Sequence, residues 1–392
     1  MISRCAAAAF LGLSSAAAYA DPPDISAGQA LFERQWVPSP SPTHTGAGLG
    51  PLYDAPSCSS CHAGGGPGLV STSIGTGLLV RLGQQGGGAD PVYGSQLQTK
   101  AVPGVIPEAT VTIGWRILDG RRIPSLHISG LGYGALDPLT FAAIRRAPSL
   151  HGAAELESVP DDELLSLEAR EHREGVGGRA AIVADAQGRH VSRFGWKAAA
   201  ADLTTQTVLA LERDIGLSTS GRPDPWGECT PAEGQCRATA SRNADSAIEV
   251  PDRSRDAIVA YVSSQPAPAA FDRSSRGHAI FQHIGCAACH ASLTAKDGSQ
   301  VDALTDLLLH DMGPELNDGI GEGAAKSFEW RTAPLWNIAD ELAAGGLLHD
   351  GRARNIGEAV RWHGGQAVRA RDLYAALSPA DLSAIDDYLL RK

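Results

Sequence analysis

Short stretches of apolar residues recur at three- to four-residue spacing along the chain, and this spacing predicts amphipathic helices. Start signals strengthen two of them: three acidic residues follow Pro160, and Ser378 stands as an N-cap before Pro379. The predicted helices cover residues 28–32, 137–147, 160–172, 197–214, 252–264, 277–285 and 378–391. Each is short, so loops must connect a large part of the chain.

One region has the pattern of strands instead. Between residues 100 and 130, β-branched residues are interleaved with Gly, Pro and polar residues. Residues 216–245 are predicted as loop. The 45 Gly and 24 Pro among 392 residues indicate extensive irregular structure. We therefore expect a mostly α fold with long loops and a little β.

Composition narrows the class of protein. Hydrophobic residues make up 43% and charged residues 20%, which is typical of a soluble globular protein. The net charge is −11 and there is no long basic run, so we do not expect nucleic-acid binding. Beyond the N-terminus, no segment is apolar enough to predict a transmembrane helix.

The N-terminus has the features of a Sec signal peptide. Arg4 supplies a positive charge, an apolar and small-residue stretch follows, and residues 18–20 form an A-x-A cleavage site. A membrane anchor is the alternative, but the stretch is short and charged, Pro-rich sequence comes directly after it. We predict that residues 1–20 are a signal peptide and that the mature chain is periplasmic.

Seven cysteines are present, and three of them lie outside any repeated motif. Cys5 belongs to the predicted signal peptide. Cys229 and Cys236 lie in a loop rich in Pro and Gly, and in an oxidising compartment this predicts a local disulfide. The alternative is a reactive dithiol, although the spacing is not the C-x-x-C of many redox pairs.

The other four cysteines form two CxxCH motifs, Cys58/Cys61/His62 and Cys286/Cys289/His290. Two thioether bonds from such a motif can hold one haem, and the adjacent His then becomes the proximal iron ligand. Zinc is the alternative, but a zinc site needs four converging ligands. Both motifs follow a G-x-x-[LI]-F helix pattern, so the pair looks like a duplication. We predict two covalently bound haem c groups.

The motifs also predict the domain organisation. An N-terminal cytochrome c-like domain with insertions should span residues 21–265 and contain the first motif. A Pro-rich linker follows. A C-terminal cytochrome c-like domain should span residues 270–392 and contain the second motif.

Several segments resemble a known family. With the two CxxCH motifs, residues 331–337 (RTAPLWN) and 348–352 (LHDGR) resemble the bacterial di-haem cytochrome c peroxidase/MauG superfamily. More narrowly, the chain resembles the di-haem oxidoreductase family, sometimes labelled thiol oxidoreductases, at residues 48–53, 193–198, 307–313 and 362–365. The resemblance implies that the N-terminal haem is the peroxide site and that the C-terminal haem relays electrons.

The resemblance also implies catalytic residues. In the superfamily a Gln, and a Glu ten residues later, flank the peroxide, and Gln98 and Glu108 have this spacing. Cleavage of the O–O bond requires a proton to move between the peroxide oxygens, and a carboxyl group can move it. The alternative is that Glu108 is an exposed loop residue, as most Glu residues are.

The superfamily places the sixth ligand of the C-terminal iron 14 residues after the His of the HDG motif. Counted from His349, this position is His363, so the resemblance implies ligation by His290 and His363. The alternative is Met312, the only Met besides Met1.

The N-terminal iron has no obvious sixth ligand. His44, His127 and His151 are weak alternatives, and an open position suits a substrate-binding metal. The family often has Ca²⁺ between the haems, but Ala344 and Gly346 replace the Thr and Pro expected before the HDG motif, which leaves Ca²⁺ open. Four tryptophans are candidate electron relays, although packing in the core or against a haem is the favoured interpretation of each: Trp115, Trp196, Trp330 and Trp336.

The implied function is that of a periplasmic, peroxidase-like oxidoreductase. It would reduce H₂O₂ at the N-terminal haem, with electrons from a small redox protein of cytochrome c or cupredoxin type passing through the C-terminal haem. One alternative is a di-haem electron-transfer cytochrome without a substrate. Another is oxidation of a different substrate, as in MauG or the rubber oxygenases. A thiol oxidoreductase would need redox-active Cys229 and Cys236.

Overall fold

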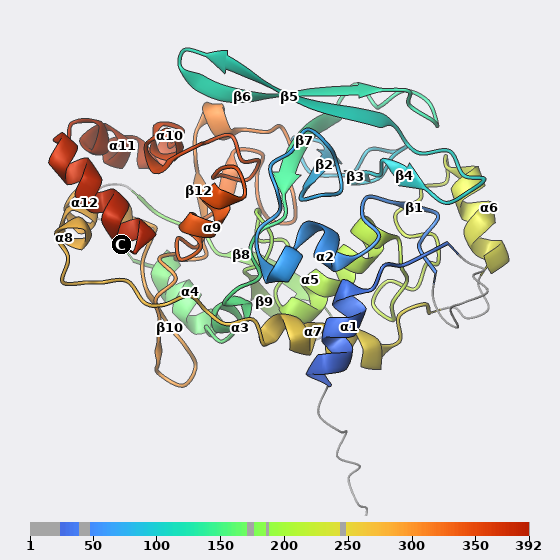
Figure 1. Cartoon of the computed structure of the whole chain (residues 1–392), viewed down its shortest axis with the longest axis horizontal. Coiled ribbons are helices and arrows are strands. Elements are labelled where there is room, and N and C mark those ends of the chain that lie inside the picture. The colour runs from blue at the N-terminus through green and yellow to red at the C-terminus, as the bar shows by residue number, and fades with distance from the viewer. Residues whose placement is uncertain (1–23, 39–47, 171–175, 186–187, 244–247, 392) are drawn as a thin grey trace, which may run out of the picture.

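The computed structural model describes residues 24–38, 48–170, 176–185, 188–243 and 248–391 (Figure 1). The predicted signal peptide and His44 lie outside these ranges. Within them, no helix combines the length and apolar character that a membrane span requires.

Short helices occur along the whole described chain, the longest of 12 residues. They are α1 (Ile25–Glu33), α2 (Cys58–Cys61), α3 (Ala153–Glu157), α4 (Asp161–Glu168), α5 (Leu203–Ala210), α6 (Gly234–Asn243), α7 (Asp252–Ser263), α8 (Arg276–His283), α9 (Ile338–Ala343), α10 (Ile356–Arg361), α11 (Val368–Ala375) and α12 (Pro379–Leu390). The helices predicted at 160–172, 252–264 and 378–391 are confirmed as α4, α7 and α12. Ser378 caps α12 as predicted, since its Oγ accepts a hydrogen bond from the Asp381 backbone N–H at 3.2 Å.

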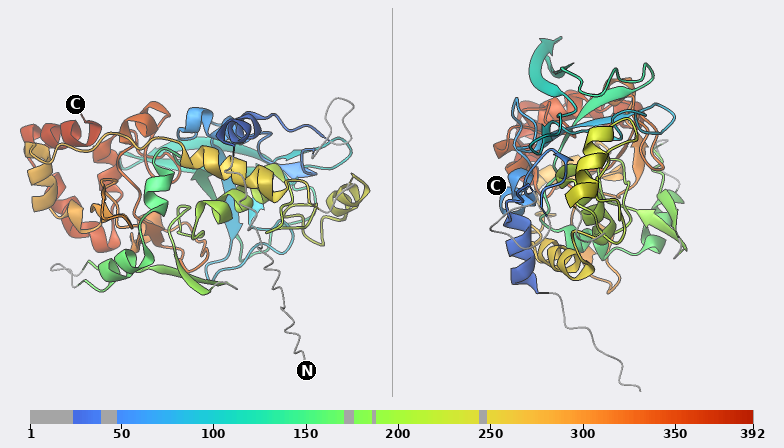
Figure 2. Two further views of the ribbon diagram at one scale, coloured as in Figure 1. Left: turned by 90° about the horizontal axis from the view of Figure 1, so that it is seen from below. Right: turned by 90° about the vertical axis from the view of Figure 1, so that its right-hand side faces the viewer.

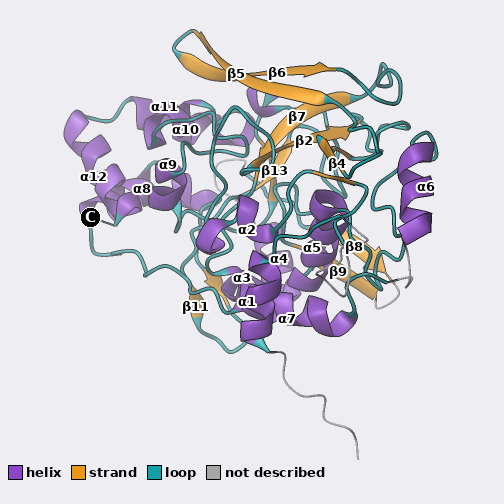
Figure 3. Ribbon diagram, turned by 45° about the vertical axis from the view of Figure 1, so that its right-hand side comes forward, coloured by secondary structure: helices purple, strands orange, loops and turns teal. Residues whose placement is uncertain are grey.

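Strands are more frequent than the expected mostly α fold allows, and the architecture is mixed. They form small antiparallel sheets among long loops (Figure 3). The strands are β1 (Leu52–Tyr53), β2 (Leu78–Gly83), β3 (Gln96–Leu97), β4 (Lys100–Ala101), β5 (Thr110–Leu118), β6 (Arg121–Ser129), β7 (Phe141–Arg146), β8 (Ala181–Asp185), β9 (Gly188–Ser192), β10 (Leu293–Thr294), β11 (Gln300–Val301), β12 (Leu309–Asp311) and β13 (Glu329–Arg331). The fold-class prediction therefore underestimated the β content.

Two local predictions are wrong. The helix expected at 137–147 is instead β7, which pairs with β2 along its whole length, from Leu78 opposite Arg146 to Gly83 opposite Phe141. Pairing and burial against β2 outweigh the helical periodicity of this short segment. The loop expected at 216–245 contains α6.

The strand-like region at 100–130 is confirmed and forms a long hairpin of β5 and β6. Asp119 and Gly120 make its turn, both with positive φ (50° and 74°), as a tight hairpin connection requires. The hairpin extends along the edge of the molecule (Figure 1). Arg121, near the turn, lies over the ring of Trp362 at 5.1 Å, so the hairpin of the N-terminal half contacts the C-terminal half.

The helix before each CxxCH motif packs against a later helix in the same way. In the N-terminal half α1 packs on α7, and Gly28 lies so close to Ala257 that a Cβ would come within 1.9 Å of its carbonyl oxygen. In the C-terminal half α8 packs on α12, where a Cβ on Gly277 would come within 2.0 Å of the Ala384 carbonyl oxygen.

An aromatic pair accompanies each of these contacts. The Phe32 and Tyr261 rings lie 5.1 Å apart, and the Phe281 and Tyr388 rings 5.6 Å apart. The repeated G-x-x-[LI]-F pattern thus corresponds to a repeated helix pair. The C-terminal pair lies toward one end of the molecule, apart from the N-terminal pair (Figure 2).

A disulfide joins Cys229 and Cys236, whose Cα atoms are 6.3 Å apart, and both residues are buried. It closes a short loop that begins before α6 and ends in the first turn of that helix. Replacing both cysteines with alanine should lower the free energy of unfolding by about 2–3 kcal/mol, because the denatured chain regains the freedom of that loop. Denaturant unfolding of the double variant and the wild type measures this difference. An unchanged unfolding midpoint would show that the bond does not stabilise the protein.

Candidate functional site

The N-terminal CxxCH motif forms the one-turn helix α2. Ser57 caps it, with its Oγ accepting a hydrogen bond from the Ser60 backbone N–H at 3.1 Å. Cys58 and Cys61 are three residues apart on this turn, so their side chains lie on one side of it. The His62 backbone N–H donates to the Cys58 carbonyl at 2.9 Å, which holds the histidine directly after the turn.

The C-terminal motif repeats this backbone arrangement on a 3₁₀ turn, η3 (Cys286–Ala288). Gly285 has a φ of 87°, a left-handed conformation that suits glycine and lets the chain leave α8 and turn at once into the motif. The His290 backbone N–H donates to the Cys286 carbonyl at 3.0 Å, the counterpart of the bond in the first motif.

Cys58, Cys61 and His62 line one cavity, the N-terminal cavity, with about 1770 Å³ of unfilled space including its mouth. Burial raises the pKa of both thiols to about 12, so they are protonated and weakly nucleophilic at neutral pH. Burial also lowers the pKa of His62 to about 4. The imidazole is therefore neutral, which is the form that binds a metal.

Cys286, Cys289 and His290 line a second cavity, the C-terminal cavity, with about 1520 Å³ of unfilled space including its mouth. Its wall is mainly apolar and includes Phe281 and Leu389. Burial raises the pKa of the Cys286 thiol to about 12 and lowers that of His290 to about 4.

His290 and His363 both line the C-terminal cavity, and their ring planes are inclined at 46° to each other. Their ring centroids are 6.5 Å apart. A metal bonded at about 2.0 Å to a nitrogen of each ring would place the centroids about 6 Å apart. The Nδ1 of His290 donates to the Leu304 carbonyl (2.9 Å) and that of His363 to the Ala359 carbonyl (2.8 Å), which leaves both Nε2 atoms free. Metal-binding histidines commonly have their second nitrogen held in this way.

Met312 also lines the C-terminal cavity, as His363 does. The structure therefore brings both predicted alternatives to the cavity, but the ring pairing with His290 belongs to His363. An apolar cavity with two adjacent thiols and two half-buried, neutral imidazoles fits a c-type haem. The N-terminal cavity fits one as well, with its own pair of thiols and one half-buried imidazole.

The N-terminal cavity differs in its histidines. Among the described residues, only His62 and His151 supply imidazoles to its lining. His151 Nε2 lies 3.1 Å from the Gly64 carbonyl oxygen and is held there. His127 is exposed on β6. No described histidine ring is thus paired with His62 as His363 is with His290.

Part of the N-terminal cavity wall is polar. Arg81, Gln96, Arg213, Asp214 and Glu322 line it. Arg81 donates to the Gln96 side-chain oxygen at 3.1 Å and lies 3.1 Å from a Glu322 oxygen. Arg213 is 3.9 Å from the same oxygen of Glu322. These side chains come from distant parts of the chain, and no local sequence signal pointed to them as a group.

Gln98 and Glu108 lie close together, but neither is among the described residues lining the N-terminal cavity. The Gln98 backbone N–H donates to Glu108 at 2.5 Å, and the Gln98 side chain donates to the Arg213 carbonyl at 2.8 Å. Glu108 is 1% exposed, so the surface-loop alternative is wrong. Burial and the neighbouring Glu233, to which it is hydrogen-bonded, raise the pKa of Glu108.

The two cavities share a wall. Trp196, Arg331, Ala333, Pro334 and Glu341 line both of them. The Trp196 indole N–H donates to the Arg146 carbonyl at 2.6 Å, which fixes the ring. Of the four tryptophans considered as relays, Trp196 is the one that lines both cavities.

A buried arginine occupies a carbonyl-rich position near this wall. The Arg146 guanidinium donates to the backbone carbonyls of Gly68 (2.7 Å), Glu341 (3.2 Å) and Gly346. It brings a positive charge to oxygens from both halves of the chain. This charge disfavours a second cation on the same oxygens, and Ca²⁺ stays an untested prediction.

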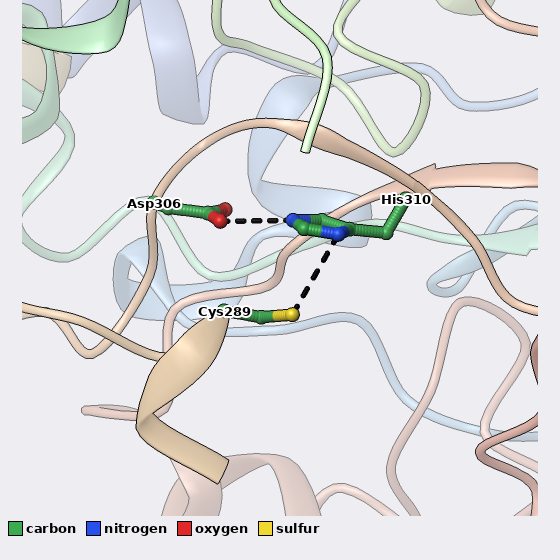
Figure 4. A group of neighbouring side chains, drawn as sticks. All are labelled: Cys289, Asp306 and His310. Carbon is green, nitrogen blue, oxygen red and sulfur yellow. Dashed lines mark hydrogen bonds and ion pairs between the residues drawn. The ribbon is translucent and has the colours of Figure 1, made fainter. Parts of the chain in front are cut away.

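Cys289 also lies near two polar residues outside the CxxCH motif, Asp306 and His310 (Figure 4). His310 lies between it and Asp306, with Nε2 2.8 Å from an Asp306 oxygen and Nδ1 3.6 Å from the Cys289 sulfur. Potential ligand atoms of the three residues lie within 4.8 Å of one another. Among the described residues this group supplies three of the four ligands that zinc requires. Zinc therefore stays the competing interpretation of the second motif.

Two CxxCH motifs, each opening into its own cavity, define the class of the protein as a candidate di-haem c-type protein. A family model described as "Di-haem oxidoreductase, putative peroxidase" matches residues 140–391. Because the match covers well over half of the chain, the protein belongs to this di-haem oxidoreductase family. The matched residues contain the second motif and begin after the first.

Other comparisons add little. No curated protein matches the chain in sequence. Among solved structures, a chain of Kuenenia stuttgartiensis hydrazine synthase, pressurised with 20 bar xenon, is similar at 13% sequence identity. The similarity covers 98% of this chain and 99% of that one with a TM-score of 0.34, too low to support a shared fold.

Proposed function

We propose that the protein is a periplasmic di-haem c-type oxidoreductase that reduces H₂O₂ in the N-terminal cavity. Family membership supports the class of reaction. In this proposal Cys58 and Cys61 hold one haem and Cys286 and Cys289 the other, with His62 and His290 as proximal ligands. A bound haem would supply the redox chemistry and the breaking of the O–O bond.

The observation that carries the proposal is the difference between the two cavities. His290 and His363 both line the C-terminal cavity, with ring centroids 6.5 Å apart, and ligation by both would close that metal centre. In the N-terminal cavity His62 has no such partner among the described residues. An open metal position beside hydrogen-bonding groups is what a small substrate requires.

The chain's own residues would perform two tasks. The polar wall of the N-terminal cavity would bind and orient the peroxide through Arg81, whose side chain donates a hydrogen bond to Gln96. The shared wall, with Trp196 fixed on the Arg146 carbonyl, would separate the two centres and keep water from filling the space between them. A small redox protein of cytochrome c or cupredoxin type would supply the two electrons, and two protons complete the conversion of one H₂O₂ to two H₂O.

Electron paramagnetic resonance of the oxidised, fully loaded protein tests the proposal. We expect one high-spin and one low-spin signal, and addition of H₂O₂ should change the high-spin signal first. Peroxide consumption should follow when a reduced small cytochrome c is supplied. Two low-spin signals that ignore peroxide would instead identify an electron-transfer cytochrome, the first alternative function. Reaction with peroxide but no turnover with the cytochrome would favour the second, oxidation of another substrate.

A further inference from the structure

The end of α5 contains a backbone irregularity beside the N-terminal cavity. The helix widens into a π-turn, η2 (Leu211–Ile215), in which the Gly216 N–H donates to the Leu211 carbonyl five residues back. Such turns are rare and redirect the side chains that they carry, often at functional sites. The turn is tied to the segment before α2, because the backbone N–H groups of Asp54 and Ala55 donate to the Asp214 carbonyl at 2.9 and 3.1 Å.

This π-turn brings the Asp214 side chain to the cavity. Asp214 lines the N-terminal cavity, and its charge raises the pKa of both Cys58 and Cys61. The carboxylate therefore shares the cavity with the two thiols that would hold the haem and acts on both of them.

The amide of Gln96 fixes this carboxylate. Its Nε2 donates to Asp214 at 2.8 Å and to Asp54 at 2.9 Å, while its oxygen accepts from Arg81 at 3.1 Å. An amide nitrogen has two hydrogens, so these two carboxylates can use both of them. Rotation of the amide would break all three contacts. Gln96 is thus a positioning residue between the buried Asp54 and the half-buried Asp214.

The surroundings of Asp54 and Asp214 raise the pKa of both carboxyl groups and so favour their protonated forms. Burial raises the pKa of Asp54 to about 7, and the charge of Asp214 adds to this effect. Burial raises the pKa of Asp214 as well, while Gln96, Arg81 and Arg213 oppose the rise. The charged or titratable groups that face Asp214 from the surrounding elements are Asp54, Cys58, Cys61, Arg81, Arg213, Glu228 and Glu322.

We propose that Asp214 is the group that exchanges protons with the substrate in the N-terminal cavity, with Asp54 as a second proton site behind Gln96. This proposal deepens the proposed function and rests on it. The Asp214 O–H bond breaks as a new O–H bond forms on a peroxide oxygen, and Asp214 regains a proton from Asp54 or solvent. No electrons pass through either carboxyl group.

A small anion tests the proposal without turnover. Fluoride is added to the oxidised, loaded protein and its binding is followed by visible absorption between pH 5 and pH 9. A protonated Asp214 can donate a hydrogen bond to the anion, whereas an ionised Asp214 repels it. We expect the fluoride affinity of the wild type to fall about tenfold per pH unit above the midpoint of the acid pair.

Asp214→Asn should remove this pH dependence and slow the reaction with peroxide by about 10²–10⁴-fold, the range of general acid–base catalysis. Glu212→Gln is the matched control, because Glu212 lies in the same π-turn and is half-buried like Asp214, yet pairs with Arg222 at 3.6 Å outside the cavity lining. That control should keep the wild-type profile.

Gln96→Leu provides a readout that does not depend on the folding of the Asp214 variant. It removes a hydrogen bond that favours the ionised form of Asp214, so the midpoint of the fluoride profile should move to higher pH.

A wild-type affinity that is independent of pH would overturn the proposal, and so would an unchanged profile in Asp214→Asn. Loss of the profile in Glu108→Gln would assign the proton to Glu108 instead. A protein that binds fluoride as expected but ignores peroxide would refute the proposed function alone.

Discussion

A chain in which Cys58 and Cys61 are both replaced with alanine is expected to carry one covalent haem instead of two. Each thioether bond needs its own sulfur, so the N-terminal cavity cannot hold its haem covalently without this pair. Mass spectrometry and the pyridine hemochrome spectrum measure the number of haems per chain. Reactivity toward H₂O₂ should disappear with the N-terminal haem, because ligation by both His290 and His363 would close the remaining C-terminal centre.

The mirror variant, with Cys286 and Cys289 replaced by alanine, is the matched control. It should also keep one haem, but it should still bind peroxide and lose only the electron supply from a reduced small cytochrome. Two haems in either variant would contradict the assignment of the motifs. Metal analysis of the wild type also tests the second motif. Zinc bound in place of iron would indicate that Cys289, Asp306 and His310 form a zinc site.

The second large effect is expected at His363. Replacing it with alanine removes one of the two imidazoles that would close the C-terminal centre, so the low-spin signal should convert to high-spin. His363→Met should retain a low-spin signal and raise the reduction potential, because a thioether ligand favours the reduced iron. Electron paramagnetic resonance and a redox titration measure both changes.

Met312→Ala is the control for this experiment, since Met312 lines the same cavity without pairing with the His290 ring. It should leave both the low-spin signal and the potential as in the wild type. If instead Met312→Ala abolishes the low-spin signal while His363→Ala preserves it, the ligand assignment is reversed.

The sequence predicted those parts of the molecule that depend on local pattern. The CxxCH motifs, the cap of α12 and the strand-like region at residues 100–130 follow from neighbouring residues. The helix expected at 137–147 fails because its partner strand, β2, lies more than fifty residues earlier in the chain. A local pattern contains no information about that pairing, which decides the conformation of β7.

The polar wall of the N-terminal cavity was beyond prediction for the same reason. Gln96 and Asp214 are 118 residues apart in sequence, yet their side chains are hydrogen-bonded. Glu322 comes from the C-terminal half to contact Arg81. The spacing of Gln98 and Glu108 pointed to the right region of the chain, but the residue of this region that lines the cavity is Gln96, in β3.

The two helix pairs, α1 with α7 and α8 with α12, have a consequence for how such a chain can be recombined. In each half, a glycine of the first helix packs tightly against an alanine of the last helix: Gly28 of α1 against Ala257 of α7, and Gly277 of α8 against Ala384 of α12. The peptide between Ser263 and Arg276 is consequently a natural crossover point for chimeras among family members. A chimera joined there would inherit both helices of each pair from a single parent and would only need to re-create the surface along which the halves meet.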